Sequence, residues 1–462
     1  MKVKRILAFA LAGATSLSLA ACGSGATASG SGDSAGLKYA DVELGTTKKD
    51  LKATITLLTP RTDMAQADYA GKGWDDYIAD FNKLYPNITV KVNADTNYGD
   101  DALTRLQGGD WGDIMMIPTV DKSDLSTYFV SMGDLATMKK EINWADAWTY
   151  DDEVYGVAPD GNVLGVVYNK KVFKEAGITE LPKTPADFLK ALKTIKDKTD
   201  AVPLYTNYAA GWTMGAWDQY IGYGATGEDD FMNNTFLHSA TAFSKYKDSD
   251  TGPYAVYKLL YDAVKDKLIE DDYSTTDWEG SKGQLNSGKI GTMFLGQWAV
   301  SQIKGAGDNA DDVGYMPFPI SVDGKQYATT GNDYSFGINK NQPLDNRDAS
   351  MIFVKWMTEK SGYAINEGSL PGDANDDSLP DSLDDFKGVT LGSDVAAKQE
   401  DADLLNTLNS DSELAFNSGG DKRVQTIVEH AANGDESYDD LVKGWNTKWN
   451  EAQKNNNITV KE

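Results

Sequence analysis

The chain has 462 residues, of which 70 are acidic and 44 basic, so its formal net charge at pH 7 is −26. Its length suits two domain-sized cores, and apolar residues make up 40% of it, enough to fill them. The negative charge disfavours nucleic acid as a partner, and one cysteine with two histidines is too few for the usual zinc sites, so no metal and no cofactor are expected.

The first residues have the composition of an export signal. A basic opening at residues 2–5 precedes 16 apolar or small residues, 6–21, which is short of the roughly 20 that span a bilayer as a helix. The only cysteine follows at Cys22, and small residues just before a cysteine resemble the lipobox of bacterial lipoproteins. We predict a signal peptide over 1–21, a lipid on Cys22 and a flexible tether over 22–50. An ordinary signal peptide with a chance cysteine is the alternative.

The next elements have the pattern of a βαβ unit. Residues 53–57 alternate apolar and polar as a half-buried strand does, and apolar residues then recur at helical spacing over 74–85. A second alternating stretch follows at 88–92. The run 114–117 is wholly apolar, which is typical of a strand in a parallel sheet covered on both faces. The pattern therefore predicts an α/β fold.

Helices dominate the later part of the chain. Thr184, Pro185 and Asp187 combine an N-cap, a proline at the first helical position and an acid at the third, so a helix is predicted to begin there. A second helix is predicted over 345–357. Near the C-terminus, Trp445 and Trp449 lie on an amphipathic stripe, which favours core packing over ligand contact.

Two motifs receive a structural interpretation. Gly222, Gly224 and Gly227 have the spacing of a dinucleotide fingerprint, but they follow a helical pattern and precede the acids 228–230, which would repel a pyrophosphate. Within 373–384, oxygen-bearing side chains fall at calcium-loop positions, namely Asp373, Asn375, Asp377, Asp381 and Asp384. Two departures are that Ser378 replaces the glycine that the turn needs and that Asp384 replaces the bidentate glutamate. We interpret the second motif as a solvated surface loop, with calcium binding as the alternative.

Aromatic side chains beside planar polar ones suggest a carbohydrate ligand. Indole faces accept the C–H patches of sugars, and carboxylate, amide and guanidinium groups bind hydroxyls in pairs. For any single tryptophan, core packing is the alternative. The clearest candidates in loop-like positions are Trp212, Trp217, Asp218, Trp278, Trp298, Asn332 and Asp333.

A secreted glycoside hydrolase is the alternative from a different class. It needs only two carboxylates about 5–10 Å apart, and 70 acids offer many pairs. No acid stands in an isolated apolar setting of the kind that would raise its pKa for general-acid catalysis. The sequence therefore favours binding over hydrolysis, and no catalytic residue is predicted.

Several segments together resemble the carbohydrate-type extracellular solute-binding proteins of ABC importers, the family that includes maltose-binding protein. They are FNKLYPNITV at 81–90, GDWGDI at 109–114, YGVAP followed by VVYNKKVFKEAG within 155–177, and GKIGTMFLGQW at 288–298. The resemblance covers nearly the whole mature chain.

The resemblance implies a two-lobed periplasmic-binding-protein-like fold with a hinge and a ligand cleft between the lobes. It places the N-terminal lobe at 51–158 plus 322–358 and the C-terminal lobe at 159–321 plus 359–462. By position it adds Asn162, where the family often has a sugar-binding acid, and Trp298 as the stacking tryptophan. Further candidates from the matching segments and from the loop after the first strand are Arg61, Asp63, Asp113 and Asp160.

The function that this resemblance implies is capture of an oligosaccharide and its delivery to the permease subunits of an ABC importer. The protein is expected to act as a monomer, to perform no chemistry, and to contact the membrane only through its lipid anchor on the extracytoplasmic face. A polyol or a sugar phosphate is the alternative ligand within the family.

Overall fold

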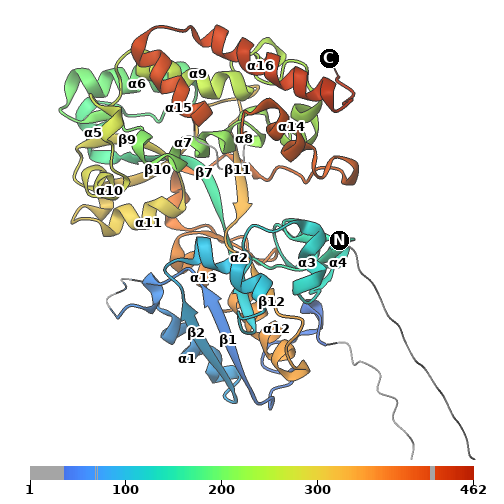
Figure 1. Ribbon diagram of the computed structural model, residues 1–462. Coiled ribbons are helices and arrows are strands. Elements are labelled where there is room, and N and C mark those ends of the chain that lie inside the picture. Colours follow the sequence, from blue (N-terminus) through green and yellow to red (C-terminus); the bar gives the residue numbers. More distant parts are fainter. Residues whose placement is uncertain (1–35, 68, 70, 417–421, 462) are drawn as a thin grey trace, which may run out of the picture. The chain divides into compact units, whose positions relative to one another are not determined.

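The computed structural model describes residues 36–67, 69, 71–416 and 422–461 (Figure 1). The predicted signal peptide and Cys22 lie outside these residues. All of the elements below belong to one compact unit, Leu37–Glu462. Among the described residues, no helix combines the length and the apolar composition that crossing a membrane requires.

The N-terminal lobe is built on a four-stranded sheet in the order β12-β3-β1-β2. Strand β1 runs parallel to β2 and β3, and β12 is antiparallel to β3. Ile55, Leu57 and Leu58 of β1 are buried in an apolar cluster that also includes Phe81 and Phe353 from the flanking helices. The lobe contains β1 (Ala53–Thr59), α1 (Trp74–Leu84), β2 (Ile88–Ala94), α2 (Tyr98–Gly108), β3 (Ile114–Met116), α3 (Leu125–Tyr128), β4 (Gly133–Asp134), α4 (Leu135–Glu141), β5 (Thr149–Tyr150), β6 (Glu153–Val154), β12 (Phe336–Ile338), α12 (Leu344–Glu359) and α13 (Tyr363–Glu367).

The C-terminal lobe is built around the ten-residue strand β7. Its sheet has the order β14-β11-β7-β9-β8, and β10 and β13 also pair with β7. The lobe contains β7 (Asp160–Asn169), α5 (Lys170–Ala176), α6 (Pro185–Lys198), β8 (Val202–Leu204), α7 (Trp212–Gly215), α8 (Tyr223–Thr226), α9 (Gly252–Lys265), α10 (Trp278–Asn286), β9 (Ile290–Gly296), α11 (Trp298–Gly305), β10 (Val313–Pro317), β11 (Tyr327–Asn332), β13 (Leu370–Pro371), β14 (Thr390–Gly392), α14 (Leu404–Ser412), α15 (Lys422–Asn433) and α16 (Tyr438–Asn455).

Local sequence signals explain several of these elements. The predicted βαβ unit is confirmed as β1, α1 and β2, with Ala53 opposite Ile88 in a parallel register. Thr184 caps α6 as predicted, because its hydroxyl accepts a hydrogen bond from the Asp187 N–H at 3.1 Å. Trp445 and Trp449 of α16 lie in the apolar cluster of the C-terminal lobe, so the core interpretation of that stripe is confirmed.

The chain crosses between the two lobes three times, and the crossings lie beside one another. Figure 1 shows the paired strands β7 and β11 running toward the N-terminal lobe. At their ends, the Asp333 N–H donates to the carbonyl of Asp160 at 3.0 Å, and Val157 and Phe336 exchange backbone hydrogen bonds. The third crossing brings β13 against β7, with Pro371 opposite Asp160.

Three segments differ from the boundaries expected from the sequence. Residues 37–50 were expected within the flexible tether, yet Tyr39 is fully buried in the core of the N-terminal lobe and the Leu37 N–H donates to Asp348. The segment 322–358 is divided, because β11 pairs with β7 whereas β12 and α12 pack in the N-terminal lobe. The third segment is α13, which was expected in the C-terminal lobe as part of 359–462, yet Tyr363 lies in the core of the N-terminal lobe. The turn around Tyr39 has no periodicity that could have indicated its partner.

Candidate ligand-binding site

A cavity of about 420 Å³ lies in the C-terminal lobe next to the crossings. A hollow of this size is typical of a small-molecule site, and most of the residues that line this one are polar. The described residues that line it are Asn162, Leu164, Asp218, Gln219, Met232, Asn233, Gly296, Trp298, Thr329, Thr330, Gly331, Asn332, Asp333 and Asp394. Of the twelve ligand-site residues predicted from the sequence, the cavity brings together Asn162, Asp218, Trp298, Asn332 and Asp333.

Paired strands β7 and β11 position the polar wall of the cavity. Asn162 lies opposite Gly331 in the antiparallel register, so its side chain meets the residues that follow β11. Its amide Nδ2 donates to Asp333 Oδ2 at 3.0 Å, and the Oδ1 atom is buried without a hydrogen-bond partner among the described residues. Asn332 donates to the Asp333 carbonyl at 2.9 Å. This wall presents amide and carboxylate groups suited to hydroxyls.

The aromatic wall depends on the glycine that ends β9. A Cβ on Gly296 would stand 2.5 Å from Nε1 and 2.8 Å from Cδ1 of Trp298, so only glycine leaves the indole its observed place. Gln297, between them, is anchored on both sides: its Oε1 accepts from the Val163 N–H at 3.2 Å and its Nε2 donates to Ser382 at 3.1 Å. The sequence Gly-Gln-Trp thus fixes an indole at the cavity.

Trp212 and Trp278 lie outside the lining of the cavity but contact Trp298. The three ring centroids are 5.7–5.8 Å apart in every pair, which makes one aromatic cluster. Each of the three tryptophans is the first residue of its helix, α7, α10 or α11. The predicted residues Trp212, Trp278 and Trp298 therefore lie together, with only the last of them in the cavity wall.

Two lining carboxylates have different surroundings. Asp218 is 1% exposed and forms an ion pair with Arg423 of α15. It also accepts a hydrogen bond from the Tyr257 hydroxyl at 2.6 Å. Asp394, which the sequence reasoning missed, accepts the Tyr223 N–H at 2.9 Å. Burial, and to a lesser extent the charge of Asp229, raise the pKa of Asp394 to about 6. Asp394 is therefore a carboxylate of the cavity lining whose charge changes near pH 6.

The glycines of the apparent dinucleotide fingerprint have a packing role beside the cavity. A Cβ on Gly222 would stand 2.6 Å from the carboxylate of Asp394, and the Gly224 N–H donates to the Thr329 hydroxyl at 2.9 Å. The neighbouring π-helix Phe231–Thr235 supplies Met232 and Asn233 to the lining. Such helices occur often at functional sites, although no sequence pattern predicted this one.

Arg61 and Asp63 do not line the cavity. The Arg61 guanidinium donates to Asp63 at 2.9 Å, to Glu367 of α13 at 2.7 Å and to the hydroxyl of Tyr363 at 3.0 Å, so most of its donors are used within the N-terminal lobe. Burial opposes ionisation of Asp63, but the Arg61 hydrogen bonds and charge outweigh it and lower its pKa. The network lies near the first crossing, since the charge of Arg61 acts to lower the pKa of Asp160 there against the effect of burial.

Three other predicted residues are placed away from the cavity lining. Asp113 is buried and accepts the Thr56 N–H and the Asn346 amide, both at 2.8 Å, so it supports the fold. Trp217 is buried against Phe294, with ring centroids 4.4 Å apart. Asp160 is 5% exposed at the first crossing, where burial and then the charge of Asp333 raise its pKa well above the usual range.

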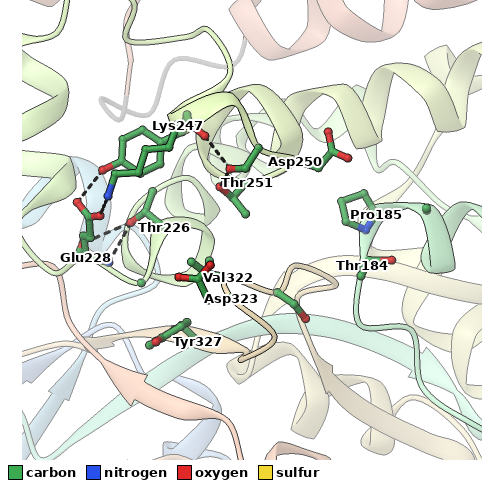
Figure 2. Close-up of a pocket in the computed structure, with 15 residues that line it drawn as sticks. Thr184, Pro185, Thr226, Glu228, Lys247, Asp250, Thr251, Val322, Asp323 and Tyr327 are labelled. Carbon is green, nitrogen blue, oxygen red and sulfur yellow. Dashed lines mark hydrogen bonds and ion pairs between the residues drawn. The ribbon is translucent and has the colours of Figure 1, made fainter. Parts of the chain in front are cut away.

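A larger cavity of about 600 Å³ lies elsewhere in the C-terminal lobe. Figure 2 shows Thr184 and Pro185 on one side of it and Glu228 with Lys247 on the other. Glu228 already pairs with Lys247 and accepts the Tyr246 hydroxyl at 2.6 Å, and no tryptophan is among its described lining residues. The smaller cavity therefore has the chemistry that suits a sugar. Within the described residues, no three His, Cys, Asp or Glu side chains form a group that could hold a metal ion.

Comparison with known proteins agrees with a sugar-binding role for this site. Residues 65–364 match the model of the bacterial extracellular solute-binding protein family. The multiple sugar-binding protein of Streptococcus mutans is 26% identical over 367 residues, which cover 77% of this chain and 78% of that protein.

Two solved structures from Bifidobacterium animalis subsp. lactis are similar over most of the chain. A manno-oligosaccharide-specific solute-binding protein in complex with mannotriose is 58% identical, with a TM-score of 0.84, over 91% of this chain and 99% of that one. A binding protein of an ABC transporter in complex with mannobiose is 56% identical, also with a TM-score of 0.84, over 92% of this chain and all of that one.

Proposed function

The chain belongs to the family of bacterial extracellular solute-binding proteins, and from this membership we propose that it captures a manno-oligosaccharide and delivers it to the permease of an ABC importer. It is a carbohydrate-binding component of such a transporter, outside the cytoplasm, with the two-lobed fold of its relatives. It is not an enzyme, since these relatives are solute-binding proteins and not glycoside hydrolases.

The observation that best supports this ligand is the composition of the smaller cavity. One indole, that of Trp298, stands beside amides and carboxylates from Asn162, Asn332 and Asp333, and none of the described lining residues is lysine or arginine. A cavity of this charge repels a sugar phosphate and accepts a neutral sugar, whose hydroxyls donate to the carboxylates. The sugar-phosphate alternative is therefore the weaker one.

Capture is proposed to involve closure of the lobes about the three crossings. The cavity wall comes from the C-terminal lobe and the crossings, so the second wall would be the face of the N-terminal lobe near Arg61 and Asp63. A ligand shifts the balance toward closure only by binding the closed form more tightly than the open one. Hydroxyls that contact both walls would supply that difference.

Anchoring through a lipid on Cys22 remains part of the proposal. Replacing Cys22 with serine should release the protein from the membrane fraction into the medium, as measured by immunoblotting of cell fractions. Release of the wild-type protein to the same extent would contradict anchoring at this residue. Membrane attachment is expected to be firm, because two or more acyl chains contribute about 0.8 kcal/mol for each buried CH₂.

The ligand proposal is tested by isothermal titration calorimetry with mannobiose, mannotriose, erythritol and mannose 6-phosphate. We expect heat of binding with the two manno-oligosaccharides only. Trp298→Ala should weaken mannotriose binding by about 1.5–3 kcal/mol, which is roughly 10- to 150-fold, since a large apolar contact is removed. Binding of the sugar phosphate instead, or an unchanged affinity in the variant, would contradict the assignment.

Delivery needs a separate measurement. Cells that lack this protein should lose uptake of labelled mannotriose, and the wild-type gene should restore it. A Trp298→Ala gene should restore uptake only at raised mannotriose concentrations, because capture is weakened while docking to the permease is not. Full uptake without the protein would contradict a role in import.

A further inference from the structure

One carboxylate in the wall of the smaller cavity has an oxygen to spare. Asp394 lines this cavity, and its Oδ1 accepts the Tyr223 N–H at 2.9 Å. Its Oδ2 has no hydrogen-bond partner among the described residues, and it is not one of the unpartnered oxygens that the protein encloses. A hydroxyl that enters the cavity can therefore donate a hydrogen bond to Asp394.

The other two carboxylates of the described lining are engaged by the protein itself. Asp218 forms its ion pair with Arg423. Both oxygens of Asp333 accept hydrogen bonds, Oδ1 from the N–H of the next residue at 2.8 Å and Oδ2 from the Asn162 amide at 3.0 Å. Asp394, with its single hydrogen bond, is the least committed of the three acids that surround the cavity.

No cation offsets the charge of Asp394 within the described part of the lining, which contains neither lysine nor arginine. The charge that acts on it is that of Asp229, which has the same sign and lies just ahead of the π-helix Phe231–Thr235. Burial and then this charge raise the pKa of Asp394 to about 6. A carboxylate kept in a cavity at such a cost is typical of a functional group, because packing alone gives no reason to retain it.

The residues on either side of Asp394 hold it in place. Before it, the Ser393 hydroxyl lies 2.8 Å from the Thr330 hydroxyl of β11. After it, the Val395 N–H donates to the carbonyl of Asp229 at 2.8 Å. A carboxylate fixed from both sides needs little reordering to meet a ligand, which lowers the cost of binding.

We propose that Asp394 binds a sugar hydroxyl as a carboxylate, so that capture of a neutral oligosaccharide releases a proton to the solvent. This inference rests on the proposed function and deepens it, because it makes pH a regulator of the same site. A hydroxyl that donates to the carboxylate favours the charged form and lowers its pKa in the complex. Proton and ligand then compete, so the affinity falls as the pH drops below about 6 and levels off above about 7.

Isothermal titration calorimetry with mannotriose, in buffers of different ionisation enthalpy, counts the proton. At pH 6 about half of the free protein carries it, so the wild type should release up to about half a proton per ligand, and almost none at pH 7.5. Its affinity at pH 5 should be about three- to tenfold lower than at pH 7.5. Proton uptake on binding, or equal affinities at the two pH values, would overturn the proposal.

Three variants assign the proton. Asp394→Asn keeps an acceptor for the Tyr223 N–H but has no proton to release, so its affinity at both pH values should be near that of the wild type at pH 5. Asp229→Asn removes the like charge, so release should persist with its midpoint at lower pH. Asp230→Asn, at the neighbouring exposed acid, is the matched control and should behave as the wild type does.

The outcomes separate this proposal from the function on which it rests. Failure of the wild type to bind mannotriose or mannobiose at either pH would overturn the proposed function, and the proton release with it. Binding without proton release would overturn the proton linkage alone. Release that persists in Asp394→Asn would assign the proton to another group, such as Asp160 at the first crossing, and would overturn the role of Asp394.

Discussion

The indole of Trp144 lies directly over the backbone of Gly161, at the first crossing between the lobes. A Cβ on Gly161 would stand 2.6 Å from Cζ2 of Trp144 and 2.5 Å from the carbonyl oxygen of Gly331. Trp144 follows Ile142 of the N-terminal lobe's core, but its ring packs on the cluster of the C-terminal lobe, and its Nε1 donates to Ser393 at 3.0 Å. Its φ of 55° is a strained value for a tryptophan. One side chain thus connects the two lobes at the hinge.

Replacing Gly161 with alanine should therefore destabilise the protein. The added methyl group cannot fit between the indole and the Gly331 carbonyl, and overpacking of this kind costs about 1–3 kcal/mol. The measurement is the free energy of unfolding from a urea titration. Gly331→Ala is the matched control, since a Cβ there would meet nothing within 4 Å. An equal loss in both variants would contradict a specific contact with Trp144.

Gly296→Ala should weaken ligand binding with little effect on folding. The new methyl group would displace the Trp298 indole, which lies at the surface of the cavity and can move. We expect the affinity for mannotriose to fall by about 1–2 kcal/mol, part of the contact that Trp298→Ala removes. Calorimetry gives the affinity and thermal unfolding gives the stability. A drop in stability with normal affinity would show that Gly296 serves the strand rather than the indole.

Asp394 should make stability depend on pH in a defined window. Its pKa in the folded protein is about 6, above the ordinary value of 3.8, so between about pH 4 and 6 the folded chain keeps a proton that the unfolded chain has lost. Stability therefore falls as pH rises through this window, and the full cost of the buried charge is present above pH 6.

Asp394→Asn removes that cost and keeps an acceptor for the Tyr223 N–H. At pH 7.5 its Tm should exceed that of the wild type by about 2–4 °C, on the order of 1 kcal/mol, and the gain should vanish by about pH 4. Differential scanning calorimetry at both pH values measures it, with Asp110→Asn, at an exposed acid, as the control. A gain of the same size at both pH values would rule out titration of Asp394 as its origin.

Local patterns accounted for much of the fold. The alternation at 53–57 and the cap at Thr184 are properties of a few neighbouring residues, so the sequence alone predicts β1 and the start of α6. The stripe containing Trp449 likewise predicts a buried helix face. Tyr39 had no such signal, because a three-residue turn has no period and its burial depends on residues far along the chain.

The candidate site was less predictable for the same reason. Trp212 and Trp217 stand in similar local sequence, yet one is exposed beside Trp298 and the other is packed on Phe294, a difference that only tertiary contacts decide. Asp394 reaches the cavity from a segment without motif or periodicity. Its proximity to Gly222, which tolerates no side chain there, is visible only in three dimensions.

The buried pair of Asp218 and Arg423 predicts that Asp218 matters first for folding, although it lines the cavity. Both side chains are almost fully buried, at 1% and 4% exposure, and Asp218 also accepts the Tyr257 hydroxyl. Asp218→Asn would leave the guanidinium charge without its counter-ion, which typically costs about 3–5 kcal/mol. Arg423→Met should cost a similar amount, and the double variant should recover most of the loss, because no buried charge remains in it. Urea unfolding of the four proteins gives the coupling energy. If the two losses simply add in the double variant, the ion pair does not stabilise this lobe, and a ligand-binding role for Asp218 becomes the better explanation of its position.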